Sequence, residues 1–160
     1  MAIKRTIKRQ NLVRPVAMDY SSGGLAMSQA SQNIANTISN VTKFVDDCGL
    51  GVTLKPKESW INIYKKGDFQ EYHNHPDSFI SAIYIIDSPI EDASKIYFQS
   101  PLLEQVTVPY IKFENKPTGH IEYQSQPGKL LIFRSYINHC VTQHLSDKNR
   151  ISIAYNFYKI

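Results

Sequence analysis

The chain has 160 residues, of which 42% are hydrophobic and 20% charged, and its formal net charge is +4. This length suits one domain with its own core, so we expect residues 1–160 to form a single domain. No apolar run is long enough to span a bilayer, and the N-terminal residues lack the apolar core of a secretory signal. Cys48 and Cys140 are too few and too far apart for a disulfide framework or a zinc knuckle, so we expect a cytoplasmic protein.

Basic residues gather near the start of the chain: Lys4, Arg5, Lys8, Arg9 and Arg14. A solvated basic arm is the simpler interpretation, because no aromatic interleaving or nucleic-acid motif accompanies them. We therefore expect no nucleic-acid partner. Two roles of the arm and the following helix stay open: shaping an entrance to the site or mediating a homodimer.

Apolar residues at helical spacing follow from Met27 to Val45, and they predict one amphipathic helix. Its expected packing stripe is Ile34, Ile38, Val41 and Val45. Residues 1–51 would thus form an N-terminal arm and helix ahead of the main fold.

After Gly51, short β-branched and aromatic runs alternate with Gly, Pro, Asn and Asp, which is typical of an all-β sandwich or barrel. Eight strands are predicted: Trp60–Tyr64, Phe79–Ile86, Lys95–Phe98, Val106–Phe113, His120–Gln124, Lys129–Phe133, His139–Thr142 and Arg150–Tyr158. Because no βαβ alternation appears, we predict a mainly β fold, a double-sheet jelly roll over residues 52–160 with one helix in front.

Side-chain alternation indicates which strand faces matter, since neighbouring residues of a strand point to opposite sides. Trp60, Asn62 and Tyr64 share one face of their strand and suit the wall of a half-buried cavity. In the last strand, the face opposite Ile151, Ile153, Tyr155 and Phe157 carries Arg150, Ser152, Ala154 and Asn156.

Two of the five histidines, His73 and His75, stand two residues apart after the turn at Gly67. On an extended chain both imidazoles leave the same face and could hold one metal ion. The candidates for a third ligand are His120, His139 and His144. His139 follows a turn, an apolar strand and a short loop, whereas we expect His120 and His144 to be exposed to solvent.

Four motifs in order resemble the iron(II)- and 2-oxoglutarate-dependent oxygenase superfamily, and in particular its small members in bacteria and phages. They are Trp60-x-Asn62-x-Tyr64-x-x-Gly67, His73-x-His75-Pro76-x-Ser78-Phe79-x-Ser81-x-x-Tyr84, Pro127-Gly128-x-Leu130-x-x-Phe133 leading to His139, and Arg150-x-Ser152-x-x-x-Asn156-Phe157. The resemblance covers about the last two-thirds of the chain. It implies a double-stranded β-helix, which agrees with the strands predicted above. It also implies that the protein acts inside a bacterial cell or a phage-infected host cell.

The resemblance also implies a set of site residues. His73 and His139 would be the first and last ligands of a facial triad that leaves iron positions open for cosubstrate and O₂. Arg150 would bind the far carboxylate of 2-oxoglutarate, with Ser152 completing an Arg-x-Ser pattern. Tyr64 would add a hydroxyl, and Asn62 or Asn156 would orient the cosubstrate or a ligand. No catalytic residue beyond the metal site is implied.

The chain departs from the family pattern at one ligand, because His75 stands where the triad usually has a carboxylate. Either three neutral histidines hold the iron, or Asp77 is the second ligand in a shifted His75-Pro76-Asp77 frame. The spacing from Gly67 favours His73, His75 and His139. Three neutral imidazoles leave the iron its full charge, which still suits dianionic 2-oxoglutarate.

The implied function is an Fe(II)- and 2-oxoglutarate-dependent dioxygenase that hydroxylates an unidentified small-molecule or peptide substrate with O₂, releasing succinate and CO₂. One alternative is a metal-dependent cupin-type dioxygenase or isomerase without 2-oxoglutarate. Gly67 and the histidine pair match the opening of the cupin signature, but its glutamate and its second motif are missing. The other alternative is a non-enzymatic jelly-roll binding module with exposed histidines.

Overall fold

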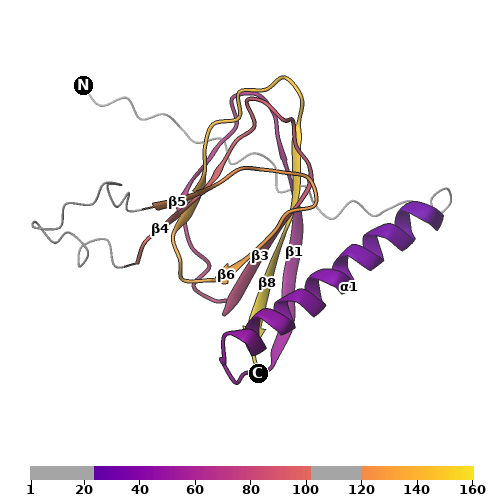
Figure 1. Cartoon of the computed structure of the whole chain (residues 1–160), viewed down its shortest axis with the longest axis vertical. Helices are drawn as coiled ribbons and strands as arrows, with labels where there is room; N and C mark the ends of the chain where they lie inside the picture. Colours follow the sequence, from indigo (N-terminus) through magenta and orange to yellow (C-terminus); the bar gives the residue numbers. More distant parts are fainter. Residues whose placement is uncertain (1–23, 102–119) are drawn as a thin grey trace, which may run out of the picture.

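The computed structural model describes residues 24–101 and 120–160 (Figure 1). The basic arm and the predicted strand at 106–113 lie outside the described residues. Within them, the chain runs through one helix, α1 (Gly24–Asp47), and the strands β1 (Leu54–Tyr64), β2 (Gln70–His73), β3 (Ile80–Asp87), β4 (Ile96–Gln99), β5 (His120–Tyr123), β6 (Leu130–Arg134), β7 (His139–Val141) and β8 (Arg150–Lys159). The mainly β fold with one N-terminal helix is therefore confirmed.

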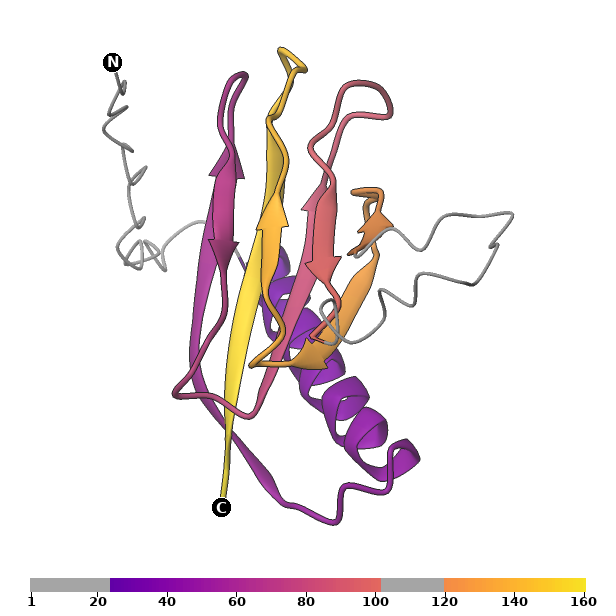
Figure 2. The same cartoon turned by 90° about the vertical axis from the view of Figure 1, so that its left-hand side faces the viewer.

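The described strands form two antiparallel four-stranded sheets. One has the order β1-β8-β3-β6 and contains the long strands; the other has the order β2-β7-β4-β5 and contains short ones. Figure 2 shows the short strands in front, the long strands behind them and α1 behind both. This is the double-sheet arrangement expected from the pattern of short strands.

The helix covers the outer face of the long-stranded sheet. Val41 and Val45 are buried against Ile80, Ala82 and other apolar side chains of that face. Ile34, by contrast, is 42% exposed, so the predicted packing stripe holds only over the later turns of α1. Burial of apolar area is the main term that fixes the helix on the sheet.

A second apolar cluster lies between the two sheets. Ile83, Ile85 and Phe133 of the long sheet meet Ile96 and Val141 of the short one. On β3 the buried residues thus alternate between the two clusters, as the period of a strand requires. Both faces of this sheet are covered.

One strand begins well before its predicted start, and another was not predicted at all. β1 begins at Leu54 rather than Trp60, because a register shift between Pro56 and Glu58 lets the strand continue through Pro56 and pair with β8. The strand Gln70–His73 was not predicted, since its sequence Gln-Glu-Tyr-His has no apolar alternation. It pairs with β7 and brings His73 opposite His139.

Candidate metal and cosubstrate site

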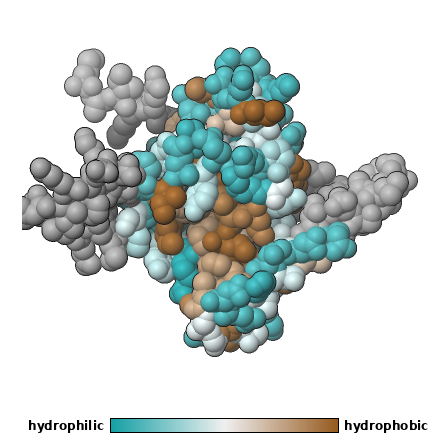
Figure 3. Space-filling view, in the orientation of Figure 1, coloured by the Kyte–Doolittle hydropathy of each residue, from teal (hydrophilic) through white to brown (hydrophobic). Residues whose placement is uncertain are grey.

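The space between the sheets holds a cavity of about 300 Å³. Its wall includes alternate residues of β1 and β8, which pair in register: Tyr64 with Arg150, Asn62 with Ser152, Trp60 with Ala154, and Glu58 with Asn156. The predicted cavity-facing side of β1 is therefore correct, and the face that Arg150, Ser152, Ala154 and Asn156 share on β8 is also the inward one. Figure 3 shows an apolar area at the centre of one face of the molecule, surrounded by hydrophilic side chains.

Three histidines converge on this cavity. The possible ligand atoms of His73, His75 and His139 all lie within 4.8 Å of one another. His73 and His139 are direct partners across the β2–β7 ladder, and their ring centroids are 4.2 Å apart. Residues opposite one another on antiparallel strands have close Cβ atoms, which explains why two such distant positions in the sequence meet.

His75 reaches the same point from the loop after β2. Its backbone N–H donates to the carbonyl oxygen of Ser135 at 2.9 Å, and its ring centroid lies 5.3 Å from that of His73. Its ring also lies 5.9 Å from that of Trp60. The pair thus comes together although only His73 belongs to a strand.

Hydrogen bonds fix the imidazole tautomers of two of these histidines. Nδ1 of His73 lies 2.8 Å from the carbonyl oxygen of Glu71, and Nδ1 of His139 lies 3.0 Å from that of Ile137. A carbonyl oxygen only accepts, so each Nδ1 carries the hydrogen and each Nε2 keeps its lone pair. This is the arrangement in which a histidine ligates a metal through Nε2.

Burial favours the neutral form of two of these histidines, His139 and His75. It lowers the pKa of His139 to about 3, with further lowering from the neighbouring His73 and His75 and an opposing effect of the Ile137 carbonyl. Burial and the proximity of His73 also lower the pKa of His75. Because metals bind the neutral imidazole, a lowered pKa favours binding at neutral pH.

The rival ligand Asp77 is placed differently. It is exposed and does not belong to the histidine group. Lys57 Nζ lies 3.4 Å from its backbone oxygen, on the outside of the loop. The donor set that the structure brings together is three imidazoles, which is a chemically reasonable set for iron.

Arg150 lies in the cavity wall and is only 1% exposed. Its Nε donates to Ser125 Oγ at 2.7 Å and its Nη1 lies 3.4 Å from Ser152 Oγ. Within the described part of the chain its Nη2 is buried and has no hydrogen-bond partner. A buried guanidinium with an unused donor is suited to a carboxylate, which it can bind through charged hydrogen bonds.

Tyr64 and Ser152 complete the surroundings of this guanidinium. The Arg150 Cζ atom lies 4.9 Å from the centroid of the Tyr64 ring. Burial raises the pKa of Tyr64 and lowers that of Arg150. The Tyr64 hydroxyl therefore stays protonated at neutral pH and can donate a hydrogen bond.

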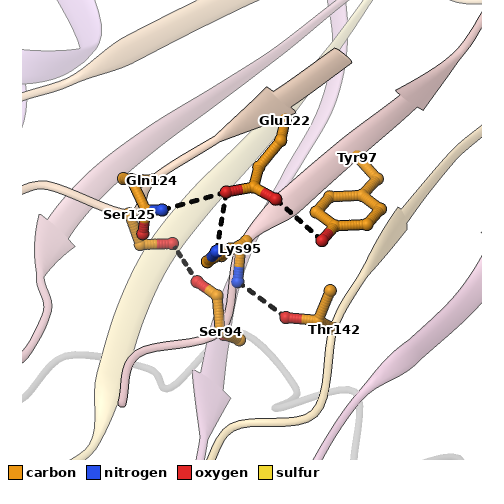
Figure 4. Close-up of polar contacts among 7 residues, drawn as sticks. All are labelled: Ser94, Lys95, Tyr97, Glu122, Gln124, Ser125 and Thr142. Carbon is orange, nitrogen blue, oxygen red and sulfur yellow. Dashed lines mark hydrogen bonds and ion pairs between the residues drawn. The ribbon is translucent and has the colours of Figure 1, made fainter. Parts of the chain in front are cut away.

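Ser125 was missed by the sequence reasoning, since nothing in its local pattern marks it. Its Oγ also donates to the backbone oxygen of Ser94 at 2.6 Å. Figure 4 shows the surrounding contacts, in which Glu122 accepts from Lys95 and Tyr97 while the Lys95 backbone donates to Thr142. This network holds the loop that supports Arg150.

Asn156 lies at the other end of the cavity, with Asn62 between it and Arg150 along the wall. Its Oδ1 accepts from Ser81 Oγ and its Nδ2 donates to Glu58 Oε1 at 2.9 Å. Nδ2 also lies 3.5 Å from His75 Nδ1, at the limit of a hydrogen bond. Glu58 was missed because β1 was predicted to begin two residues after it.

The expectation that His144 is exposed was wrong, since its exposure is 0%. Its Nδ1 accepts from the Ser94 N–H and its Nε2 donates to the Lys148 carbonyl, so both ring nitrogens are used within the protein. His120 is partly buried and stacks on Tyr97 at 4.7 Å between ring centroids. Neither residue belongs to the metal-ligating group.

Comparison with known proteins agrees with this geometry. Residues 58–156 match the model of a protein family described as "Putative 2OG-Fe(II) oxygenase". Comparison with curated proteins found no significant match. Among the described residues, no helix is long and apolar enough to cross a membrane.

Solved structures share the fold at low sequence identity. An oxidoreductase of the 2OG-Fe(II) oxygenase family from Burkholderia pseudomallei has a TM-score of 0.60 and 14% identity, over 84% of this chain and 58% of that one. A prolyl-4-hydroxylase from Pseudomonas putida has a TM-score of 0.58 and 16% identity, over 82% and 65%. The alpha-ketoglutarate-dependent epimerase SnoN of nogalamycin biosynthesis has a TM-score of 0.51 and 13% identity, over 68% and 50%.

The chain thus spans less than two-thirds of the length of these structures. The double-stranded β-helix implied by the resemblance is confirmed by them. The family match covers more than half of the sequence and includes every residue of the site described above. The chain therefore belongs to the 2OG-Fe(II) oxygenase family, whose cofactors are Fe(II) and 2-oxoglutarate.

Proposed function

We propose that the protein is an Fe(II)- and 2-oxoglutarate-dependent dioxygenase that hydroxylates its substrate and releases succinate and CO₂. The observation that carries this proposal is one cavity that holds both converging imidazoles and a buried arginine with an unused donor. Neither a cupin-type enzyme without 2-oxoglutarate nor a binding module would need a buried guanidinium whose Nη2 has no hydrogen-bond partner among the described residues.

In this proposal His73, His75 and His139 hold the Fe(II). The free Nε2 atoms of His73 and His139 support their part, and the lowered pKa values of His75 and His139 keep lone pairs available at neutral pH. The exposed position of Asp77 outside the group supports His75 as the second ligand.

Arg150 would bind the far carboxylate of 2-oxoglutarate. Its Nη2 offers the hydrogen bond, while Ser125 and Ser152 hold the guanidinium in place and Tyr64 can donate its hydroxyl. We expect Asn62, one inward position from Tyr64, to line the cosubstrate, and Asn156, at the other end of the wall, to orient it.

The bound iron and 2-oxoglutarate would supply the oxidising chemistry, in which one atom of O₂ enters succinate and the other enters the substrate. The protein's own part is to position and to shield. Burial of His139 and Arg150 limits the access of water, and the two sheets hold their donors at fixed distances.

Solved structures with this fold include both a prolyl-4-hydroxylase and an epimerase, so more than one reaction outcome occurs on it. Of these outcomes we propose hydroxylation.

We also propose that residues 1–160 act as a single cytoplasmic domain, with 52–160 as the catalytic barrel. A gel-filtration measurement would distinguish a monomer from a homodimer.

The test is turnover of the iron-loaded protein across a panel of small molecules and peptides. We expect at least one substrate to stimulate succinate release above the rate without substrate, with a product heavier by one oxygen atom. Iron and 2-oxoglutarate binding with a product of unchanged oxygen content would contradict hydroxylation. Failure to bind 2-oxoglutarate would contradict the whole assignment.

A further inference from the structure

We propose that the substrate carries a cationic group, an ammonium or a guanidinium, which Glu58 and Trp60 hold at the end of the cavity opposite Arg150. This inference rests on the proposed function, because it takes the histidines and Arg150 to be engaged by iron and 2-oxoglutarate. It concerns the part of the cavity that those ligands leave to the substrate.

The cavity has opposite charges at its two ends. The inward residues of β1 run from Glu58 through Trp60 and Asn62 to Tyr64, and they pair with the inward residues of β8. Arg150 pairs with Tyr64, which lies six residues after Glu58 on β1. Six residues of a strand span roughly 20 Å. The far carboxylate that Arg150 holds therefore lies far from Glu58.

One of the proposed ligands, His75, lies near the Glu58 end of the cavity. The ring of His75 lies 5.9 Å from Trp60 and its Nδ1 lies 3.5 Å from Asn156, the residue that also binds Glu58. A molecule seated against Glu58 and Trp60 is thus close to His75 and to the iron that this residue would hold. A carbon to be oxidised has to lie close to that iron.

The Glu58 carboxylate is held in place and remains available. Asn156 Nδ2 donates to its Oε1 at 2.9 Å, and Asn156 is itself fixed by Ser81, which contacts Ser135. Within the described residues Glu58 takes part in no ion pair, and it is the one carboxylate in the cavity wall. The neighbouring Lys57 reaches instead toward the Asp77 carbonyl oxygen at 3.4 Å.

Trp60 adds an aromatic surface one inward position further along β1. An ammonium or guanidinium over an indole ring is attracted by the ring's quadrupole, and the attraction grows when water is excluded. A carboxylate and an indole side by side thus favour a cation over its neutral isostere. A molecule whose group here is negative would be repelled by Glu58.

The experiment compares charged and neutral isosteres on the full chain loaded with Fe(II) and 2-oxoglutarate without oxygen. The probes are Nα-acetyl-arginine amide against Nα-acetyl-citrulline amide, and Nα-acetyl-lysine amide against Nα,Nε-diacetyl-lysine amide, so that the side-chain charge is the only charge that differs. Because Trp60 is the only tryptophan of the chain, its fluorescence reports binding directly. We expect each cation to bind about 10-fold more tightly than its neutral isostere, since carboxylate and indole both act on its charge.

Glu58→Gln should reduce this preference to about 2-fold or less while iron and 2-oxoglutarate binding stay unchanged. Glu91→Gln removes an exposed acid outside the cavity wall and should keep the preference. Equal binding of cation and isostere, no binding of either, or an unchanged preference in Glu58→Gln would overturn the inference. Failure of the unmodified chain to bind iron or 2-oxoglutarate would instead overturn the proposed function. The visible absorption of the iron complex reports that binding separately.

Discussion

His139 and His144 are both buried, at 2% and 0% exposure, yet their surroundings differ in kind. At His144 both ring nitrogens are hydrogen-bonded to the backbone, and the residue joins the loops of Ser94 and Lys148. At His139 only Nδ1 has a hydrogen-bond partner among the described residues, and the ring lies in a group whose ligand atoms are within 4.8 Å of one another. The comparison teaches that unused hydrogen-bonding capacity, more than burial, separates a ligand histidine from a structural one.

The largest expected effect comes from removing a ligand. His73→Ala and His139→Ala should each weaken iron binding by at least about 100-fold, since losing a direct ligand should exceed the loss typical of an outer partner. Isothermal titration of iron(II) without oxygen measures this. Asp77→Ala is the matched control and should change the affinity less than about 3-fold. Complete loss of iron in the Asp77 variant would refute His75 as the second ligand.

The opposite behaviour is expected at His144. His144→Ala leaves the Ser94 N–H and the Lys148 carbonyl without partners in a buried place, so we expect it to lower the free energy of unfolding by about 2–4 kcal/mol. Urea denaturation measures this change. The folded variant should still bind one iron. Loss of iron without loss of stability would mean that the two histidines had been assigned the wrong roles.

Arg150 extends the same comparison to a cation with an unused donor. Arg150→Gln should weaken 2-oxoglutarate binding by about 30-fold or more while iron binding stays, because a charged hydrogen bond to the carboxylate is lost. Ser125→Ala removes the support of Nε and should cause a smaller loss in the same direction. If 2-oxoglutarate binds the Arg150 variant normally, the far carboxylate must be held elsewhere.

The smallest expected effect concerns acid stability of the iron-free protein. The pKa of His139 is lowered to about 3 in the folded chain, whereas an unfolded histidine titrates near 6.5. The unfolded state therefore binds more protons as the pH falls from about 6.5 to 3, and stability falls with it.

Between pH 7 and pH 4.5 the titration of His139 alone lowers the free energy of unfolding by about 2–3 kcal/mol. Urea denaturation of the iron-free wild type and of His139→Asn at the two pH values isolates the effect, because the variant lacks the titrating ring. Parallel losses of stability in the two proteins would show that His139 is not held neutral by its surroundings.

Much of the arrangement followed from the sequence because strand alternation is a local property. The strand period predicted that Trp60, Asn62 and Tyr64 share a cavity-facing side of their strand, and they do. It also predicted that Arg150, Ser152 and Asn156 share one face of the last strand, which proves to be the inward face. The short strand Gln70–His73 was not, since its polar residues become a strand only through pairing with β7. Long-range pairing of this kind leaves no local signal.

The misplacement of His144 has the same origin. Polar neighbours such as Ser146, Asp147 and Lys148 suggest an exposed loop, but the ring is buried, where it accepts from the Ser94 N–H of a distant segment and donates to the Lys148 carbonyl of its own loop. Ser125 and Glu58 were likewise invisible, since each gains its role from a partner on another strand, Arg150 and Asn156 respectively.

The central claim is that one cavity binds Fe(II) through three histidines and 2-oxoglutarate through Arg150. Its most direct test is a titration of 2-oxoglutarate into the iron-loaded, oxygen-free protein, followed by visible absorption. We predict a charge-transfer band that saturates at one 2-oxoglutarate per iron in the wild type and requires much higher concentrations in Arg150→Gln. Tightly bound iron with no band at any 2-oxoglutarate concentration would contradict the account and favour a cupin-type metal enzyme.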